Sequence, residues 1–507
     1  MSRGVRGHPT GAHEARSYIL AIFSGFLLTL AFPRWNLWPL AWAALIPLFH
    51  ALEKARSRKQ AFIFGFTAGF VFFLLSLSWL RHVTVFGLFF VAAMQTAYWG
   101  VFGLVSFETQ RAGKRLAPAI LLPAVWVALE FIRSEIPVWG FGWNLLGYSQ
   151  APNLWIAQLA SLIGAYGVGF LVFLGNAVLY SVIRRGKSEL RTAFLFLLLI
   201  GAGLLFGWSR MVSAAGEPRF RVTVLQGNIP QLLKWDPAYR EQILKIYLNL
   251  TELAGYDRPQ LIVWPEAAYP GFFNRELEAG RVRALVRKIE TPLLVGSPHQ
   301  EDDGFFNSAY LLDRSGDTLQ RYDKIRLVPF GEYVPWKPVF GFLERYAYSL
   351  GVGDFNAGRE WTVFGLGESG PKFSVLVCFE DIFPGVARKF VGQGADFLTV
   401  ITNDAWFGRS SAPYQHLQAS IFRAIENGVS VVRAANSGVS GFITPEGRVA
   451  ERVKNQEGKD TFVMGGMTYP VVWAKEKTFY RRGGWIFPVV CLAGVLVAGI
   501  FQRKESR

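Results

Sequence analysis

Three short stretches of the sequence place reactive side chains at the ends of apolar runs that are typical of strands. Glu266 follows the run LIVW and a proline, Lys324 lies in the stretch YDKIRLVPFGEYVP, and Cys378 lies in the run FSVLVCF. A thiol is a useful nucleophile only as the thiolate, and an ammonium beside a carboxylate base can provide that ionisation without histidine. We therefore predict covalent catalysis by Cys378, with Glu266 moving the proton and Lys324 stabilising an oxyanion.

Taken one at a time, these residues have ordinary structural explanations. A single cysteine is usually a small core side chain, Glu266 could cap a helix, and Lys324 could be a solvated surface charge. The second cysteine, Cys491, lies in an apolar run near the C-terminus, so the segment around Cys378 has no other thiol. A nucleophile, a base and an ammonium that all lie at strand ends are together more typical of an active site.

The residues around these stretches alternate between short β-rich runs and helical runs, which predicts a domain of strands and helices in turn. The expected strands cover 221–227, 261–264, 293–296, 373–379 and 397–402, and the expected helices cover 237–254, 276–289, 384–392 and 414–427. Turn signals at 313–317 and 444–447 predict hairpins, so the sheet is expected to be mixed. Roughly 250 residues are enough for such a domain to have its own core.

The rest of the chain is too apolar for a soluble domain. Of the 507 residues, 51% are hydrophobic and only 18% are charged. A membrane-spanning helix needs about 20 mostly apolar residues. Runs near this length begin at Tyr18, Trp38, Ala61, Val83, Leu116, Ile156, Ala193 and Trp485. We therefore predict a membrane α-helical bundle of eight transmembrane helices, with seven in 1–208, the catalytic domain in 209–484, and the eighth helix and a tail in 485–507.

The net charge of +16 does not indicate a nucleic-acid partner. The segment from Ser209 to Gly484 contains 33 Lys or Arg and 30 Asp or Glu. Most of the net positive charge therefore lies in short connectors and tails outside this segment. One alternate set of connectors, together with both termini, holds 17 Lys or Arg, whereas the other set holds three. The positive-inside rule therefore predicts cytoplasmic termini and an outward-facing catalytic domain, which in a bacterial inner membrane is periplasmic.

The order Glu266, Lys324, Cys378 within the motifs WPE, YDKIRLVPFGEYVP and VCFED resembles the nitrilase, or carbon-nitrogen hydrolase, superfamily. With the apolar runs and the stretch QGNIPQLLKWD at 226–236, nearly the whole chain is similar to the apolipoprotein N-acyltransferase family. This resemblance implies a nitrilase-like α-β-β-α sandwich in which these three residues form the catalytic triad.

The resemblance also implies supporting or substrate-binding roles for Glu332, Phe379, Glu380 and Trp235. Many relatives have tyrosine where this chain has Phe379, so a hydrogen bond expected from that hydroxyl is lost here. The reaction of the family moves a fatty acyl group from a membrane phospholipid, through a cysteine thioester, to the α-amino group of the N-terminal diacylglyceryl-cysteine of a lipoprotein. The implied partners are therefore a phospholipid donor, a lipoprotein acceptor and the membrane.

Conversion of an ester to an amide is downhill, so we expect no nucleotide, cofactor or metal, and we expect the chain to act as a monomer. Because both substrates are lipids, the site must open toward the bilayer. Aromatic side chains favour the headgroup level of a membrane. We therefore expect an entrance formed by residues 336–355 together with Trp143 and Tyr148, although ordinary packing would explain these rings equally well.

Two other functions would use the same features. A membrane-anchored amidase or nitrilase would use the triad with water as the acceptor but would need only one anchor, and a transporter or receptor would only bind a ligand. His299 and His416 form no metal-ligand cluster, while spacing alone leaves open a dyad of Cys378 with His416. Within the membrane part, Glu130 most needs a partner, and Arg133 lies one turn away.

Overall fold

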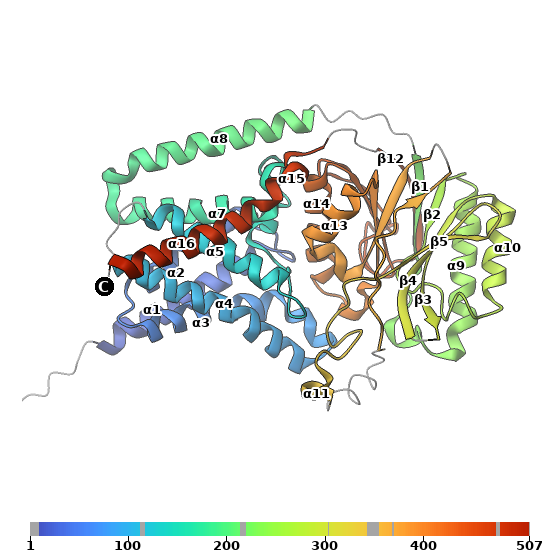
Figure 1. Cartoon of the computed structure of the whole chain (residues 1–507), viewed down its shortest axis with the longest axis horizontal. Helices are drawn as coiled ribbons and strands as arrows, with labels where there is room; N and C mark the ends of the chain where they lie inside the picture. The colour runs from blue at the N-terminus through green and yellow to red at the C-terminus, as the bar shows by residue number, and fades with distance from the viewer. Residues whose placement is uncertain are drawn as a thin grey trace, which may run out of the picture.

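The computed structural model describes residues 10–111, 117–212, 220–302, 304–341, 354–367, 370–472 and 477–505. The chain forms two parts that lie side by side (Figure 1). Helices from both ends of the chain make the helical part, and the segment from β1 to β12 makes the sandwich.

The helical part contains three stretches that, among the described residues, are long and apolar enough to cross a membrane: Arg58–Ser76, Val85–Arg111 and Ala160–Val212. A shorter apolar helix covers Gly484–Gly499. The predicted helical N-terminal region is therefore confirmed, with three candidate spans, whereas the count of eight stays a prediction. The helices are α1 (Thr10–Leu30), α2 (Ile46–Glu53), α3 (Arg58–Ser76), α4 (Val85–Arg111), α5 (Ala117–Glu135), α6 (Leu154–Ala157), α7 (Ala160–Arg185), α8 (Leu190–Val212), α15 (Phe479–Arg482) and α16 (Phe487–Glu505).

The apolar run that begins at Trp38 is not one continuous helix. Pro39 lies in the short 3-10 helix Trp38–Trp42, and α2 begins only at Ile46, beside Pro47. Proline fits the first turn of a helix but breaks its interior, because it lacks an N–H and its ring clashes with the preceding turn. With eight residues, α2 is about 12 Å long, well short of the roughly 30 Å of a bilayer core.

The pair predicted within the membrane part is present. Arg133 Nη2 lies 3.4 Å from Glu130 Oε1, and both side chains are buried. Arg133 also donates to the carbonyl oxygens of Phe141, at 2.9 Å, and Trp143, at 3.2 Å. The pair therefore fixes the loop after α5, which reaches the sandwich.

Two six-stranded sheets make up the sandwich, in the orders β12-β1-β2-β3-β4-β5 and β11-β10-β9-β8-β7-β6. The strands of the first sheet are β1 (Phe220–Gln226), β2 (Leu261–Val263), β3 (Leu293–Glu301), β4 (Gly304–Leu312), β5 (Thr318–Asp323) and β12 (Gly465–Val471). Those of the second are β6 (Phe364–Gly365), β7 (Lys372–Val377), β8 (Phe397–Thr402), β9 (Ser430–Ala435), β10 (Gly441–Ile443) and β11 (Val449–Arg452). Each sheet mixes parallel and antiparallel pairs, as predicted.

Helices cover both outer faces of the sandwich (Figure 1). The first sheet carries α9 (Arg240–Gly255) and α10 (Ala279–Ile289), whereas α13 (Pro384–Gly392) and α14 (Ala412–Asn427) lie between the second sheet and the helical part. The short α11 (Lys337–Phe340) lies in the connection from β5 to β6. Side chains of both sheets, such as Val224 and Val400, share one hydrophobic core. This is the predicted α-β-β-α order.

Candidate active site

Glu266 lies in a tight turn just after β2. Pro265 ends the strand because it has no N–H for the ladder, and Ala267 has a left-handed φ of 45°. Gly296 on β3 allows the turn to approach, since a Cβ there would lie 2.1 Å from the carbonyl oxygen of Pro265. The carboxylate is thereby held at the end of the strand with the residue 8% exposed.

Lys324 follows β5 and lies buried between two carboxylates. Its Nζ is 2.9 Å from Glu332 Oε1 and 3.7 Å from Glu266 Oε1. Burial alone would lower the pKa of Lys324, but Glu332 and Glu266 outweigh it and raise the pKa well above its ordinary value. Lys324 is therefore a permanent ammonium, suited to stabilising negative charge and unsuited to accepting a proton.

Asn307 on β4 joins the same two carboxylates and was missed by the sequence analysis. Its Nδ2 donates to Glu266 Oε1 and to Glu332 Oε1, both at 2.8 Å. Glu332 Oε2 also accepts the backbone N–H of Val328 at 2.8 Å. These donors, together with Lys324, allow two carboxylates that would otherwise repel each other to lie side by side.

Cys378 begins the 3-10 turn Cys378–Ile382 at the end of β7. Its φ is 53°, a left-handed value that residues with a Cβ rarely adopt and that often occurs at functional sites. Burial and the charge of Glu266 raise the pKa of the thiol well above its ordinary value, although Lys324 and Thr402 oppose them. The resting thiol is therefore protonated, and a nucleophilic role would require a base to take its proton.

Glu380 connects the segments that carry Lys324 and Cys378. Its Oε1 accepts the backbone N–H groups of the two residues that follow Lys324, at 2.8 and 3.0 Å. Its Oε2 accepts the N–H of the residue that precedes Cys378, at 2.8 Å. The buried Glu380 thus fixes the ammonium and the thiol relative to each other.

Lys234 is a second buried lysine beside the triad. Its Nζ donates to the carbonyl oxygen of Glu266 at 2.9 Å, and the residue is 3% exposed. Burial lowers the pKa of Lys234 to about 8, even though Glu266 and Cys378 oppose this shift. The sequence analysis missed Lys234, although it directly precedes Trp235 in the stretch QGNIPQLLKWD.

A cavity of about 500 Å³ lies between the sandwich and the helical part. The helical part contributes Ile136, Val138 and Gly140, and the sandwich contributes, among others, Ile325 and Phe379. Ile325 directly follows Lys324 and Phe379 directly follows Cys378 in the chain, so the chain neighbours of two of the three candidate residues line the cavity. Its walls carry both polar and apolar side chains and come from both parts of the molecule.

Two family models match the chain. The one described as apolipoprotein N-acyltransferase N-terminal domain matches residues 24–178, and the one described as carbon-nitrogen hydrolase matches residues 221–466. An apolipoprotein N-acyltransferase from Geobacter metallireducens is 38% identical over 99% of each chain. Another from Chlorobaculum tepidum is 33% identical over 97% of this chain and 98% of that relative. The chain belongs to the apolipoprotein N-acyltransferase family.

Among solved structures, an amidase of the nitrilase superfamily from Nesterenkonia AN1 is 21% identical, with a TM-score of 0.37. The match covers 52% of this chain and 93% of the amidase. As a member of the apolipoprotein N-acyltransferase family, the chain is an acyltransferase. The carbon-nitrogen hydrolase match covers Glu266, Lys324 and Cys378, whose catalytic roles stay a prediction.

The structure places the other two predicted residues of this acyltransferase differently. Phe379 lines the cavity, with its ring centroid 5.1 Å from that of Phe383 and 6.2 Å from that of Phe141. Trp235 is 43% exposed. Within the described part of the chain, no hydrogen bond or ring contact joins Trp235 to the triad, so its role also stays a prediction.

The predicted entrance of the acyltransferase needs a correction. Trp143 and Tyr148 are only 4% and 2% exposed, so they do not line an opening. Trp143 Nε1 donates to Gln415 Oε1 at 2.8 Å, and the Tyr148 hydroxyl accepts from Arg423 at 3.1 Å. Their polar ends instead join the helical part to the sandwich. Trp336 is 55% exposed, and residues 342–353 of the predicted entrance lie outside the described residues.

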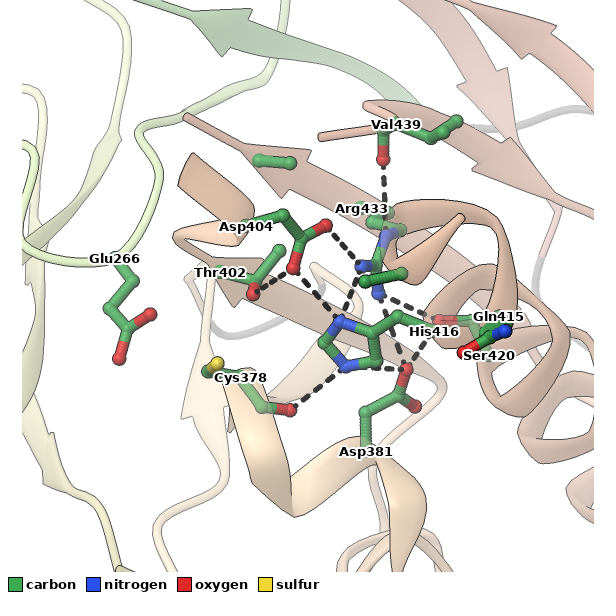
Figure 2. Close-up of polar contacts among 12 residues, drawn as sticks. Glu266, Cys378, Asp381, Thr402, Asp404, Gln415, His416, Ser420, Arg433 and Val439 are labelled. Carbon is green, nitrogen blue, oxygen red and sulfur yellow. Dashed lines mark hydrogen bonds and ion pairs between the residues drawn. The ribbon is translucent and has the colours of Figure 1, made fainter. Parts of the chain in front are cut away.

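The histidines do not extend the triad. Glu266 lies on one side of the Cys378 sulfur and His416 on the other, where His416 Nε2 is 3.2 Å from the Cys378 carbonyl oxygen (Figure 2). His299 contacts Tyr310 and a glutamate on its own strand. In the part of the chain that the structure describes, no group of three His, Cys, Asp or Glu could hold a metal ion. The expected absence of a metal stays a prediction.

Proposed function

We propose that the protein transfers a fatty acyl group from a membrane phospholipid, through a thioester on Cys378, to the α-amino group of the N-terminal S-diacylglyceryl-cysteine of lipoproteins. The observation that carries this proposal is the group of Glu266, Lys324 and Cys378. The residues that follow Lys324 and Cys378 also line a cavity to which both parts of the molecule contribute. A donor in this cavity could reach the thiol while its chains remain close to the helical part.

In the first half-reaction, the Cys378 sulfur attacks the ester carbonyl carbon of the donor while Glu266 takes the thiol proton. The Lys324 ammonium and the backbone N–H that follows Cys378 stabilise the resulting oxyanion. The bond to the glycerol oxygen then breaks, and Glu266 returns the proton to that oxygen. The products are a lysophospholipid and an acyl thioester.

In the second half-reaction, the amine of the lipoprotein attacks the thioester carbonyl and Glu266 takes a proton from the nitrogen. The carbon–sulfur bond breaks, and Glu266 returns the proton to the Cys378 sulfur. Ester and amine have become amide and alcohol, with no net change in the protein. The assignment of roles follows from charge, because Lys324 keeps its proton throughout and only Glu266 exchanges one.

The proposal includes the membrane arrangement. We propose eight transmembrane helices, the second of them interrupted between the 3-10 helix Trp38–Trp42 and α2. We also propose cytoplasmic termini and a periplasmic catalytic domain, with boundaries at 1–208, 209–484 and 485–507, in a chain that acts as a monomer. The charge asymmetry of the connectors supports this orientation. Two lipid substrates also explain why the catalytic domain has a large helical part instead of a single anchor.

The deciding experiment is to incubate the purified full chain with phospholipid vesicles and to measure the mass of the Cys378 peptide. We expect an added acyl group, followed by its transfer to a diacylglyceryl-cysteine peptide with a free amine. An acyl adduct that only water removes, or ammonia released from a small amide without any lipid adduct, would instead favour a membrane-anchored amidase.

Orientation is tested by labelling single cysteines introduced into a chain in which both native cysteines are alanine. Leu277→Cys lies in the sandwich, where Leu277 is 94% exposed, and Lys187→Cys lies in the exposed connector between α7 and α8. A membrane-impermeant maleimide should label Leu277→Cys in intact spheroplasts and Lys187→Cys only after permeabilisation. The reverse pattern would overturn the orientation.

A further inference from the structure

The side chain of Gln415 on α14 joins the sandwich to several segments of the helical part. Its Oε1 accepts the indole N–H groups of Trp79, at 2.9 Å, and Trp143, at 2.8 Å. Its Nε2 donates to the carbonyl oxygens of Pro33, at 3.2 Å, and Ser76, at 2.9 Å. Gln415 is 2% exposed, so these bonds form away from water. One amide therefore bonds to the loop after α1, the segment around the end of α3, and the loop after α5.

The next residue of α14, His416, contacts the backbone of the nucleophile. Its Nε2 lies 3.2 Å from the Cys378 carbonyl oxygen. Because that oxygen can only accept, Nε2 carries the proton and donates. The ring also packs on Trp143, with 5.3 Å between ring centroids. Trp143 of the helical part thus contacts both Gln415 and His416.

A buried ionic network holds the opposite edge of the His416 ring (Figure 2). Asp404 Oδ1 lies 3.1 Å and Arg433 Nη2 lies 2.8 Å from Nδ1. Arg433 is itself paired with Asp404, at 3.1 Å, and with Asp381, at 3.3 Å. The ring therefore has little freedom to turn, and its N–H points at one fixed place.

The contact from His416 falls on a residue whose backbone is in the left-handed region. Rotation about the backbone of Cys378 would move its carbonyl oxygen away from His416 and would also turn the sulfur and the N–H that follows it. A displacement of about 1 Å at a reacting atom can slow catalysis by roughly 100-fold. The hydrogen bond from His416 therefore bears directly on how the thiol meets an acyl carbonyl.

We propose that Gln415 and His416 are positioning residues. They link the packing of the sandwich against the helical part to the orientation of Cys378. The hydrogen bonds of Gln415 form only when the sandwich is packed against the helical part. Trp143 contacts both Gln415 and the His416 ring, and His416 orients the backbone of Cys378. The thiol then attacks efficiently only while the sandwich is packed correctly against the helical part. This inference rests on the proposed acyl transfer.

The test measures thioester formation at Cys378 in the full chain, in vesicles of phosphatidylethanolamine and phosphatidylglycerol. His416→Leu and Gln415→Leu should lower the maximal acylation rate by about 10- to 100-fold, with the half-saturating lipid concentration changed less than about twofold. His416→Gln keeps an N–H donor and should recover most of the rate. The same rates for His416→Leu and the wild type, or no recovery with His416→Gln, would overturn the proposal.

Gln418→Leu is the matched control. Gln418 lies one turn further along α14 and is buried, and its amide has no hydrogen-bond partner among the described residues. Its replacement should leave the rate within about twofold, since it breaks no link to Cys378. If Gln418→Leu and Gln415→Leu lowered the acylation rate equally, the effect would be due to altered packing of α14 in general. That result would overturn the proposal.

Trp143→Phe tests the same link if the α14 variants fold poorly. It keeps a ring against His416 but removes the N–H to Gln415, and we expect a rate at least about threefold lower, whereas an unchanged rate counts against the link. Failure of the wild type to acquire any acyl group would reject the proposed function itself. Wild-type acylation with unaffected variants would reject only this inference.

Discussion

Cys378 lies between two groups of charged side chains that are built differently. On the side of the first sheet, Glu266 is 8% exposed, and the residues that follow Lys324 and Cys378 line a cavity between the two parts of the molecule. On the side of α14, Asp381, Asp404 and Arg433 are fully buried, and Arg433 is paired with both aspartates. The first group can therefore reach a substrate, whereas the second can act only through the protein.

The protonation behaviour of the two groups differs in the same way. Burial and the charge of Glu266 raise the pKa of the Cys378 thiol, so the proposed reaction needs a base that takes the thiol proton. Behind Cys378, burial would raise the pKa of Asp404, but His416 and Arg433 outweigh it and lower that pKa to about 2. The first side therefore keeps a proton on the thiol, whereas the second keeps Asp404 as a carboxylate that contacts the His416 ring.

Removing the proton acceptor on the cavity side should have the largest effect. Glu266→Gln keeps the size of the side chain and an oxygen for Asn307, but it cannot take a proton. We expect thioester formation at Cys378 to fall by about 10²- to 10⁴-fold, with the melting temperature nearly unchanged. Acylation followed by mass spectrometry measures this rate. A fall of less than about tenfold would assign the base to another group.

Breaking the network behind Cys378 should mainly reduce stability. Arg433→Leu leaves Asp381 and Asp404 buried without their cation, so the free energy of unfolding should fall by about 3–5 kcal/mol. Denaturant unfolding in detergent measures it. Lys454→Leu, at an exposed position, should change stability by no more than about 0.5 kcal/mol, and equal effects of the two variants would contradict the comparison.

Lys234 should make stability depend on pH. The pKa of Lys234 is about 8 in the folded protein and 10.5 in the unfolded chain, so folding disfavours the protonated lysine. This lowers the free energy of unfolding at neutral pH, and the loss shrinks as pH rises from 8 toward 10.5. Between pH 7 and pH 10, the free energy of unfolding of the wild type should rise by roughly 2–3 kcal/mol relative to that of Lys234→Met. Thermal unfolding across this range measures the difference. The control is Lys245→Met, on the exposed side of α9, whose stability should depend on pH in the same way as that of the wild type. The same pH dependence for Lys234→Met and the wild type would contradict a buried charge at Lys234.

The smallest effect is expected at the cavity wall. Phe379→Tyr adds a hydroxyl to a ring that already lines the cavity, and it leaves Glu266, Lys324 and Cys378 untouched. We expect the acylation rate to stay within about threefold of the wild type. A larger gain would mean that a hydroxyl at this position takes part in the reaction, and a larger loss would mean that the cavity has no room for it.

The sequence predicted most of the sandwich because its elements carry strong local signals. The strand 397–402 and the helix 384–392 appear with the predicted bounds, and both predicted hairpin turns join neighbouring strands. Errors occur where tertiary contacts extend an element. The predicted strand 293–296 continues to Glu301, because β3 pairs with β4 along its whole length. In the helical part, prolines interrupt apolar runs in ways that hydropathy does not register.

The site was predictable where chemistry and motif coincide and unpredictable where only packing decides. Glu266, Lys324 and Cys378 stood out as reactive residues at strand ends. Asn307 has no distinguishing pattern, since an amide on a strand becomes significant only when two carboxylates converge on it. The network behind Cys378 was equally hidden, because its members come from separate elements that meet only in the folded protein.

The near-complete burial of α14 has a practical consequence. Of its sixteen residues, only Tyr414 is not buried, and the face toward the helices carries amides and charged groups as well as apolar ones. A truncated chain with residues 209–484 alone would present this face to water with its hydrogen-bonding partners removed. Such a fragment should self-associate and be a poor reagent for inhibitor screening, so the intact polypeptide in detergent or nanodiscs is the sensible unit to purify.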